Sequence, residues 1–211
     1  MKRRDLIKGA LTTIPAATAL TMLNTKWAFA QSGDFSGPLD VLNYALTLEY
    51  LEAEFYRQGN ASDLLSGTEA DYLRQIGEDE ATHVAALTDT INALGGTPVA
   101  APGVDFGEAF ASRASYLETA YVFENTGVGA YLGAAPSLFD QKELLAAAAG
   151  IFGVEARHAA VIGNLQGKPA EGGVYFNGAF EKPTPRSEVL TAVAPFLTGA
   201  AGMASGAAVT R

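Results

Sequence analysis

The sequence predicts an all-α protein: an antiparallel four-helix bundle with one long crossover and a short C-terminal appendage. Two observations lead to this fold class. Four long segments carry apolar residues at helical spacing, and Gly, Pro, Ser and Asp residues separate them. The links between the segments are unequal, and their lengths pair the first helix with the second and the third with the fourth.

Start and stop residues delimit each helix in turn. We expect helices over about residues 39–58, 68–94, 107–134 and 141–166. Thr68 is a plausible N-cap for the second helix, which ends at Gly95 and Gly96. The third helix stops before Pro136, and the fourth stops at Gly167.

The links fix the topology. About nine residues join the first two helices and about six join the last two, so each pair is antiparallel. Residues 95–106 lie between the pairs, and an extended chain of that length reaches roughly 40 Å. Helices of this size are about 30–40 Å long. The middle link can therefore cross the whole length of the bundle.

The C-terminal part is predicted as an appendage. Residues 171–180 are expected to form a short hairpin or loop over one end of the bundle. Residues 185–197 are expected to form a short amphipathic helix whose last turn Pro195 weakens. Residues 199–211 are almost entirely small side chains, which predicts a flexible tail.

The first 30 residues predict a signal peptide. A basic head containing Arg3 and Arg4 precedes an uncharged stretch that closes with Ala-Phe-Ala, so we expect cleavage after Ala30. The paired arginines resemble the twin-arginine export signal of bacteria, which carries folded proteins. The alternative is an uncleaved membrane anchor, although the strongly apolar part is shorter than the roughly 20 residues that span a bilayer. We expect an exported, periplasmic protein whose bundle and extension occupy residues 31–198.

Composition excludes several classes of protein. The chain has no cysteine, which excludes a disulfide scaffold, a thiolate zinc site and a cysteine nucleophile. Its formal net charge is −9, and a nucleic-acid partner is not expected of so acidic a chain. After the signal peptide no other apolar run was expected to span a membrane, so we expect no stable membrane insertion of the mature chain.

Both histidines of the chain belong to an internal repeat. His83 follows Glu80 by three residues and His158 follows Glu155 by three, so each pair shares one face of a helix. On the preceding helices Glu49 precedes Tyr56 by seven residues, and Glu124 precedes Tyr131 by seven. Each half of the repeat is shifted from the other by the same 75 residues. The spacing therefore repeats Glu…Tyr…Glu-x-x-His twice.

These residues continue the apolar, inward stripes of their helices. Four carboxylates inside an apolar bundle cannot stay ionised without partners, because each would cost several kcal/mol. Two divalent cations would neutralise four glutamates, and neutral imidazoles would complete the coordination. The alternative is that these are surface glutamates with two structural histidines, which leaves the repeat unexplained.

The segments LTLEYLEAEFY (46–56) and FENTGVGAY (123–131) resemble the ferritin-like superfamily of dinuclear metal proteins. The resemblance is to a bacterial, often exported branch that includes desiccation-related proteins, and it covers about residues 38–198. It implies a ferritin-like bundle with six metal ligands: Glu49, Glu80, His83, Glu124, Glu155 and His158. It also implies that Glu80 and Glu155 bridge two iron or two manganese ions.

Several of these residue assignments have alternatives. Glu52 is the alternative ligand to Glu49, but the repeat places Gly127 at the position equivalent to Glu52. Tyr56 and Tyr131 match tyrosines that hydrogen-bond the ligands, and ordinary core tyrosines are the alternative. Asp79 is a candidate to orient a histidine of the other half. The glycines 127 and 129 either leave room near the metals for a small substrate or permit close helix packing.

The ligand set suits iron or manganese without choosing between them. The leading hypothesis is a redox centre that reacts with O2 or H2O2, as a ferroxidase-like or peroxidase-like protein in oxidative-stress protection. An external electron donor would then be needed, because the chain has no cysteine for a rubredoxin-type iron site. The alternatives are a dimanganese catalase-like enzyme and a non-enzymatic, metal-stabilised stress or envelope protein. A homo-oligomer is compatible with each.

Overall fold

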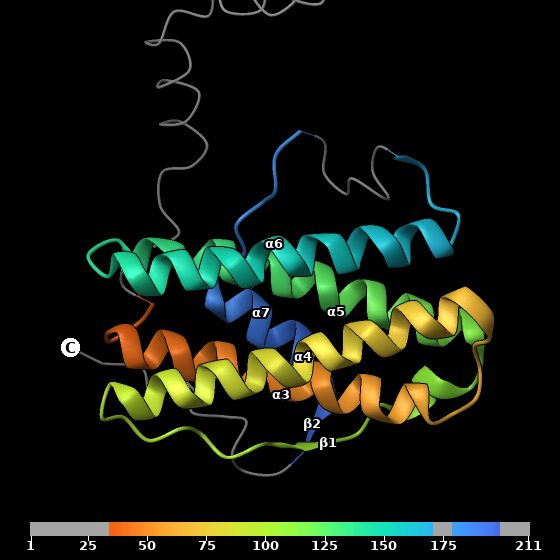
Figure 1. The fold of residues 1–211 in the computed structure, drawn as a ribbon, viewed down its shortest axis with the longest axis horizontal. Helices are drawn as coiled ribbons and strands as arrows, with labels where there is room; N and C mark the ends of the chain where they lie inside the picture. The colour runs from red at the N-terminus through yellow and green to blue at the C-terminus, as the bar shows by residue number, and fades with distance from the viewer. Residues whose placement is uncertain (1–33, 171–178, 199–211) are drawn as a thin grey trace, which may run out of the picture. The chain divides into compact units, whose positions relative to one another are not determined.

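The computed structural model describes residues 34–170 and 179–198, which all belong to the compact unit Gln31–Arg211. Its long helices are α3 (Pro38–Asn60), α4 (Gly67–Ala93), α5 (Arg113–Ala134) and α6 (Lys142–Leu165). α3 packs against α4 and α5 packs against α6, each as an antiparallel pair (Figure 1). The predicted all-α bundle of two pairs is therefore confirmed.

The ends of the helices follow local backbone rules. Gly95 and Gly167 follow the C-cap residues of α4 and α6 and adopt positive φ angles of 73° and 67°, which ends both helices within one residue of the predicted positions. The start of α4 differs from the prediction. Ser66 is its N-cap and Gly67 has a φ of 57°, so Thr68 lies inside the first turn instead of capping it.

The third helix begins later than predicted. Residues Gly107–Phe110 form a separate 3-10 turn, η1, which the sequence interpretation wrongly joined to the helix. The Ser112 hydroxyl accepts a hydrogen bond from the Ser115 backbone N–H, and the Ser115 hydroxyl accepts one from the Ser112 N–H. This reciprocal cap starts α5 at Arg113. A second 3-10 turn, η2 (Ala135–Leu138), follows α5 at Pro136.

The crossover and the C-terminal appendage meet in a small sheet. α7 (Arg186–Val193) is followed by the 3-10 turn η4 (Ala194–Phe196) and by β2 (Leu197–Thr198). β2 pairs antiparallel with β1 (Gly103–Val104) of the crossover, with Gly103 opposite Thr198. The short helix expected over 185–197 is thus shorter than predicted, because Pro195 has no N–H to continue it. The expected signal peptide, most of the hairpin region and the tail lie outside the described residues.

The apolar core leaves a polar layer along α4. Leu73 and Ile76 belong to one buried cluster, which includes the aromatic side chains around Phe55. Leu87 and Ile91, further along the same helix, belong to a second cluster. Glu80 and His83 are buried between these two stretches. The core therefore encloses charged side chains in the middle of the bundle.

The expectation that no apolar run after residue 30 is long enough to span a membrane is wrong for α6. By length and composition it is apolar enough to cross a bilayer, the only such helix in the described part of the chain, whereas the sequence interpretation found no further run of this kind. In the structure α6 packs against α5 and buries Glu155 and His158.

Candidate metal centre

Seven ionisable side chains from four helices are buried in the polar layer. None is more than 9% exposed. They are Glu49 and Glu52 on α3, Glu80 and His83 on α4, Glu124 on α5, and Glu155 and His158 on α6. Each of the six predicted ligands is among them, brought together from positions more than 100 residues apart.

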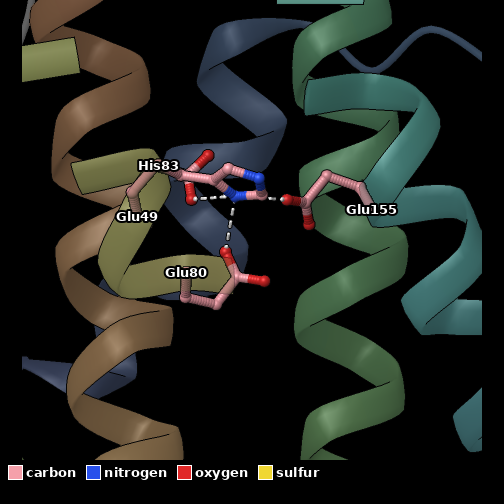
Figure 2. A group of neighbouring side chains, drawn as sticks. All are labelled: Glu49, Glu80, His83 and Glu155. Atoms are coloured by element: carbon pink, nitrogen blue, oxygen red, sulfur yellow. Dashed lines mark hydrogen bonds and ion pairs between the residues drawn. The ribbon is translucent and has the colours of Figure 1, made fainter. Parts of the chain in front are cut away.

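The first group surrounds the His83 imidazole (Figure 2). His83 Nδ1 lies 3.2 Å from Glu49 Oε2 and 3.0 Å from Glu80 Oε2. It lies 3.3 Å from Glu155 Oε1, which reaches it from α6. One nitrogen thus faces three carboxylates from three helices.

The second group surrounds His158 in the same way. His158 Nδ1 lies 2.9 Å from Glu80 Oε1 and 3.2 Å from Glu124 Oε2. Glu155 completes this group, and in each group one ligand atom per residue lies within 4.8 Å of the others. Glu80 and Glu155 belong to both groups. The two groups therefore share two carboxylates, and each has a histidine and a glutamate of its own.

Many of these donor atoms have no hydrogen-bond partner within the described protein. Glu80 Oε1, Glu124 Oε2, both oxygens of Glu155 and His158 Nδ1 are buried without one. The separations of 2.9–3.3 Å between these nitrogen and oxygen atoms are therefore contacts between atoms that point toward the same place, and not hydrogen bonds. Ligands at about 2.1 Å in octahedral geometry lie about 3.0 Å apart, which is close to the separations found here. The donor set and its unsatisfied atoms therefore fit metal ions.

Burial shifts the ionisation of the carboxylates. Burial and the charge of Glu80 raise the pKa of Glu49 to about 8, although His83 opposes this. Burial and neighbouring carboxylates raise the pKa of Glu52 and Glu155 well above the ordinary value. The same causes raise the pKa of Glu124. Without positive charge nearby, these groups would hold protons.

The histidines and Glu80 shift in the opposite direction. Burial would lower the pKa of both histidines, but the facing carboxylates raise it to about 12 for His83 and about 11 for His158. Burial would raise the pKa of Glu80, but both histidines hold it down to about 2. Five carboxylates outnumber two imidazolium charges. Because the pKa values of the other carboxylates are raised, protons neutralise this excess without metal, and divalent cations would take the place of those protons.

Two tyrosines connect the halves of the bundle. The Tyr56 hydroxyl on α3 donates a hydrogen bond to Glu124 on α5, and the Tyr131 hydroxyl on α5 donates one to Glu49 on α3. Both tyrosines are buried. They hold Glu124 and Glu49 by the carboxylate oxygens that face away from the histidines, which is the contact that the resemblance implies for these tyrosines.

Asp79 makes the site unsymmetrical. Its Oδ2 lies 3.1 Å from His158 Nε2, on the side of the ring away from the carboxylates. Asp79 is on α4 and His158 is on α6, so the contact crosses between the halves as the sequence suggests. Val154 occupies the equivalent position of the other half and cannot accept a hydrogen bond from His83.

Glu52 and the glycines take different places. Glu52 is buried but belongs to neither group of donor atoms, whereas Glu49 does. A Cβ on Gly127 would lie 3.0 Å from Glu155 Oε2 and 3.4 Å from Glu52 Oε1, so this glycine leaves space for two carboxylates. A Cβ on Gly129 would overlap Thr184 instead. Gly129 therefore permits close packing of the C-terminal segment and leaves no space at the candidate metal centre.

Sequence reasoning missed Tyr44. Its hydroxyl is buried without a hydrogen-bond partner among the described residues. The signal was its place on the inward face of α3, one turn after Val41 and one turn before Leu48.

The chain matches the model of a known protein family. A family model described as a ferritin-like domain matches residues 37–168, which is more than half of the chain. The matched range contains α3 to α6 and all the residues of the two donor groups. No curated protein matches the sequence.

Proposed function

The chain belongs to the ferritin-like family, and on that premise we propose that it binds two iron or two manganese ions that react with O2 or H2O2. The ligands would be the four glutamates and two histidines of the two groups: Glu49, Glu80, His83, Glu124, Glu155 and His158. Glu80 and Glu155 would bridge the ions. Each remaining glutamate and histidine would bind one ion.

The sharing of Glu80 and Glu155 carries this proposal. Two groups of donor atoms that share two carboxylates hold their centres close together, as a dinuclear site requires. Four ionised glutamates and two divalent ions also give a neutral site. A single ion would leave buried carboxylates unpaired, which costs several kcal/mol.

The protein's own residues would position and shield the ions. Bound iron or manganese would supply the electrons that cleave an O–O bond. Tyr56 and Tyr131 hold Glu124 and Glu49 in place, and Asp79 fixes the ring of His158. Because the ligands are buried, bulk water is kept from the centre.

The physiological setting in this proposal is outside the cytoplasm. The twin-arginine pattern before Ala30 would export the folded protein to the periplasm, where it would remove oxidants during stress such as desiccation. Electrons for a reductive cycle would come from an external donor.

A catalase-like dimanganese enzyme is the second candidate. The chain has no cysteine, so it offers no thiolate for an iron site that would receive electrons. Disproportionation of hydrogen peroxide needs no such donor. If the site catalyses no reaction, the remaining hypothesis is a non-enzymatic protein whose bundle the bound metals stabilise.

Metal content tests the proposal. The purified protein should contain about two iron or manganese ions per chain by elemental analysis. The double variant Glu80→Gln/Glu155→Gln should lose both ions, whereas Glu78→Gln, an exposed change on the same helix, should keep them. A folded wild-type protein that takes up neither metal when offered both would refute the ligand assignment.

A further inference from the structure

An apolar cavity lies one helical turn from the metal centre. Its volume is about 60 Å³, and residues of α3, α4, α5, η2 and α6 line it. Leu87 follows His83 by four residues, and Ile151 precedes Glu155 by four, so both lining residues are the axial neighbours of ligands. The cavity is therefore the next layer of the bundle beyond the ligands.

Tyr131 joins the cavity to the ligands. Its side chain lines the cavity, and its hydroxyl donates a hydrogen bond to Glu49. Leu48, the neighbour of Glu49 on α3, lines the cavity as well. A molecule in the cavity would thus be separated from a ligand carboxylate by one aromatic side chain.

The wall offers almost no hydrogen bonds. Only three lining side chains carry a polar atom. The Tyr131 hydroxyl is used by Glu49, and the Thr90 hydroxyl donates to the Ala86 carbonyl. The Tyr44 hydroxyl alone has no partner within the described residues. A buried water needs two to four polar partners, so a cavity with one free hydroxyl favours an apolar occupant over water.

The cavity opens between α4 and α6. Of its lining residues, Ala86 on α4 and Ala147 on α6 are exposed, and the others are buried or half-buried. Small side chains at the opening leave a passage that a larger side chain would close.

We infer that this cavity binds small, uncharged, apolar molecules, and that it admits dioxygen to the metal centre in preference to hydrogen peroxide. The second half of this inference rests on the proposed function. Hydrogen peroxide has two O–H donors and four lone pairs, and most of them would be left unpaired against this wall. Dioxygen has no hydrogen bonds to lose. The lining therefore selects between the two oxidants that the metal centre could use.

Xenon tests the site without any metal. The metal-free protein should bind xenon in this cavity, detected by ¹²⁹Xe NMR and by shifts in the Leu87 and Ile151 methyl signals. Ala147→Phe fills the opening and should abolish binding. Ala149→Phe, exposed on the same helix and outside the cavity, is the matched control and should leave binding intact.

A second variant is needed because the new side chain in Ala147→Phe could point into solvent and leave the cavity open. Ala148→Leu, at a half-buried lining position, should fill the cavity from within and also abolish xenon binding. The apolar site is refuted if the wild type binds no xenon. It is equally refuted if both filling variants, folded by circular dichroism, bind xenon like the wild type.

Selection between oxidants needs the iron-loaded protein. After metal content is measured, stopped-flow oxidation by O2 should be slowed at least about tenfold in Ala147→Phe, while oxidation by H2O2 stays within about twofold of wild type. Equal slowing of both reactions would overturn the selectivity. Failure to load metal would refute the proposed function and leave the xenon result standing, so the two failures are distinguishable.

Discussion

The missing side chain of Gly127 shapes the candidate metal centre at the scale of single residues. A Cβ at this position would lie 3.0 Å from Glu155 Oε2 and 3.4 Å from Glu52 Oε1, so it would crowd the two carboxylates. In the other half of the repeat the same position is Glu52 itself, so one half supplies a carboxylate and the other supplies the room for it. The two halves are complementary at this point and not symmetrical.

Gly127→Ala should therefore separate stability from metal binding. Alanine gains up to about 1 kcal/mol of helix stability over glycine, but here its Cβ would push Glu155 Oε2 away from its present place. We expect a metal-free variant at least as stable as wild type, with metal affinity reduced roughly tenfold. Chelator competition measures the affinity, and urea denaturation measures the stability.

Gly153→Ala is the control, because nothing lies within 4 Å of a Cβ at that position on α6. It should gain the same helix stability and bind metal like wild type. Unchanged affinity in Gly127→Ala would show that Glu155 can move without cost and that the glycine serves packing alone.

The repeat was enough to predict which residues meet at the centre, because ligand spacing is a local property of each helix. The repeat did not predict Asp79, because Val154 stands at the equivalent position; Asp79 was a separate candidate to orient a histidine of the other half, and it lies 3.1 Å from His158. The repeat could not assign the neighbour of Gly129. That neighbour, Thr184, comes from a segment 55 residues further along the chain, whose path no helical period encodes.

At the scale of elements, α7 is fastened to the start of α3 through Arg186. Its guanidinium donates to Asp40 Oδ2 at 3.0 Å and to the Asp34 carbonyl at 2.9 Å, and it lies over the Phe35 ring. Asp40 also accepts a hydrogen bond from the Ser36 N–H. These contacts join α7, which follows the four long helices, to the segment at the start of α3.

This attachment should weaken in acid. Burial alone would raise the pKa of Asp40, but hydrogen bonds from Ser36 and Arg186 outweigh it and lower the pKa below the ordinary 3.8. A carboxylate whose pKa is lower in the folded state stabilises the fold above its ordinary pKa, and the stabilisation is lost as pH falls through the folded value. Asp40→Asn should cost on the order of 1 kcal/mol or less at pH 7, since the pair is partly exposed.

Urea denaturation of Asp40→Asn and wild type at pH 7 and pH 3 tests this. The difference in unfolding free energy should shrink at the lower pH. Asp89→Asn, an exposed change on α4, controls for the loss of one negative charge and should show no such pH-dependent difference. A cost that is equal at both pH values would mean that Asp40 acts by its shape and not by its charge.

At the scale of the whole molecule, periodicity and link lengths predicted the bundle because they are repeated over dozens of residues. The pairing of β1 with β2 was not predictable in this way. Two residues in each strand are too few to show an alternating pattern, and the paired residues are 93 and 95 positions apart in the sequence. This pairing ties the crossover to the appendage, so the appendage is part of the fold and not an addition to it.

The fold as a whole buries carboxylates that, without metal, are neutralised by taking up protons at raised pKa values, which costs stability near neutral pH. Bound metal would remove this cost, so the stability of the fold should depend on metal. A ligand at 100 times its dissociation constant stabilises the native state by about 2.7 kcal/mol, which corresponds to roughly 5–10 °C in Tm for a chain of this size. We expect the Tm of wild type to rise by that order when Fe²⁺ or Mn²⁺ is added and to fall again with a chelator.

Glu155→Gln should weaken this dependence of stability on metal. Both carboxylate oxygens of Glu155 are buried without hydrogen-bond partners among the described residues, and burial raises its pKa well above the ordinary value. Without metal, Glu155 therefore costs stability either as a buried charge or through the uptake of a proton, and a neutral amide of the same size avoids both costs. The metal-free variant should therefore have a Tm equal to or above that of metal-free wild type, while metal should raise its Tm less. Calorimetry with and without metal measures both. If the variant has a lower Tm than wild type both with and without metal, Glu155 stabilises the bundle even without metal. The idea that the buried carboxylates lower the stability of the metal-free protein would then be wrong.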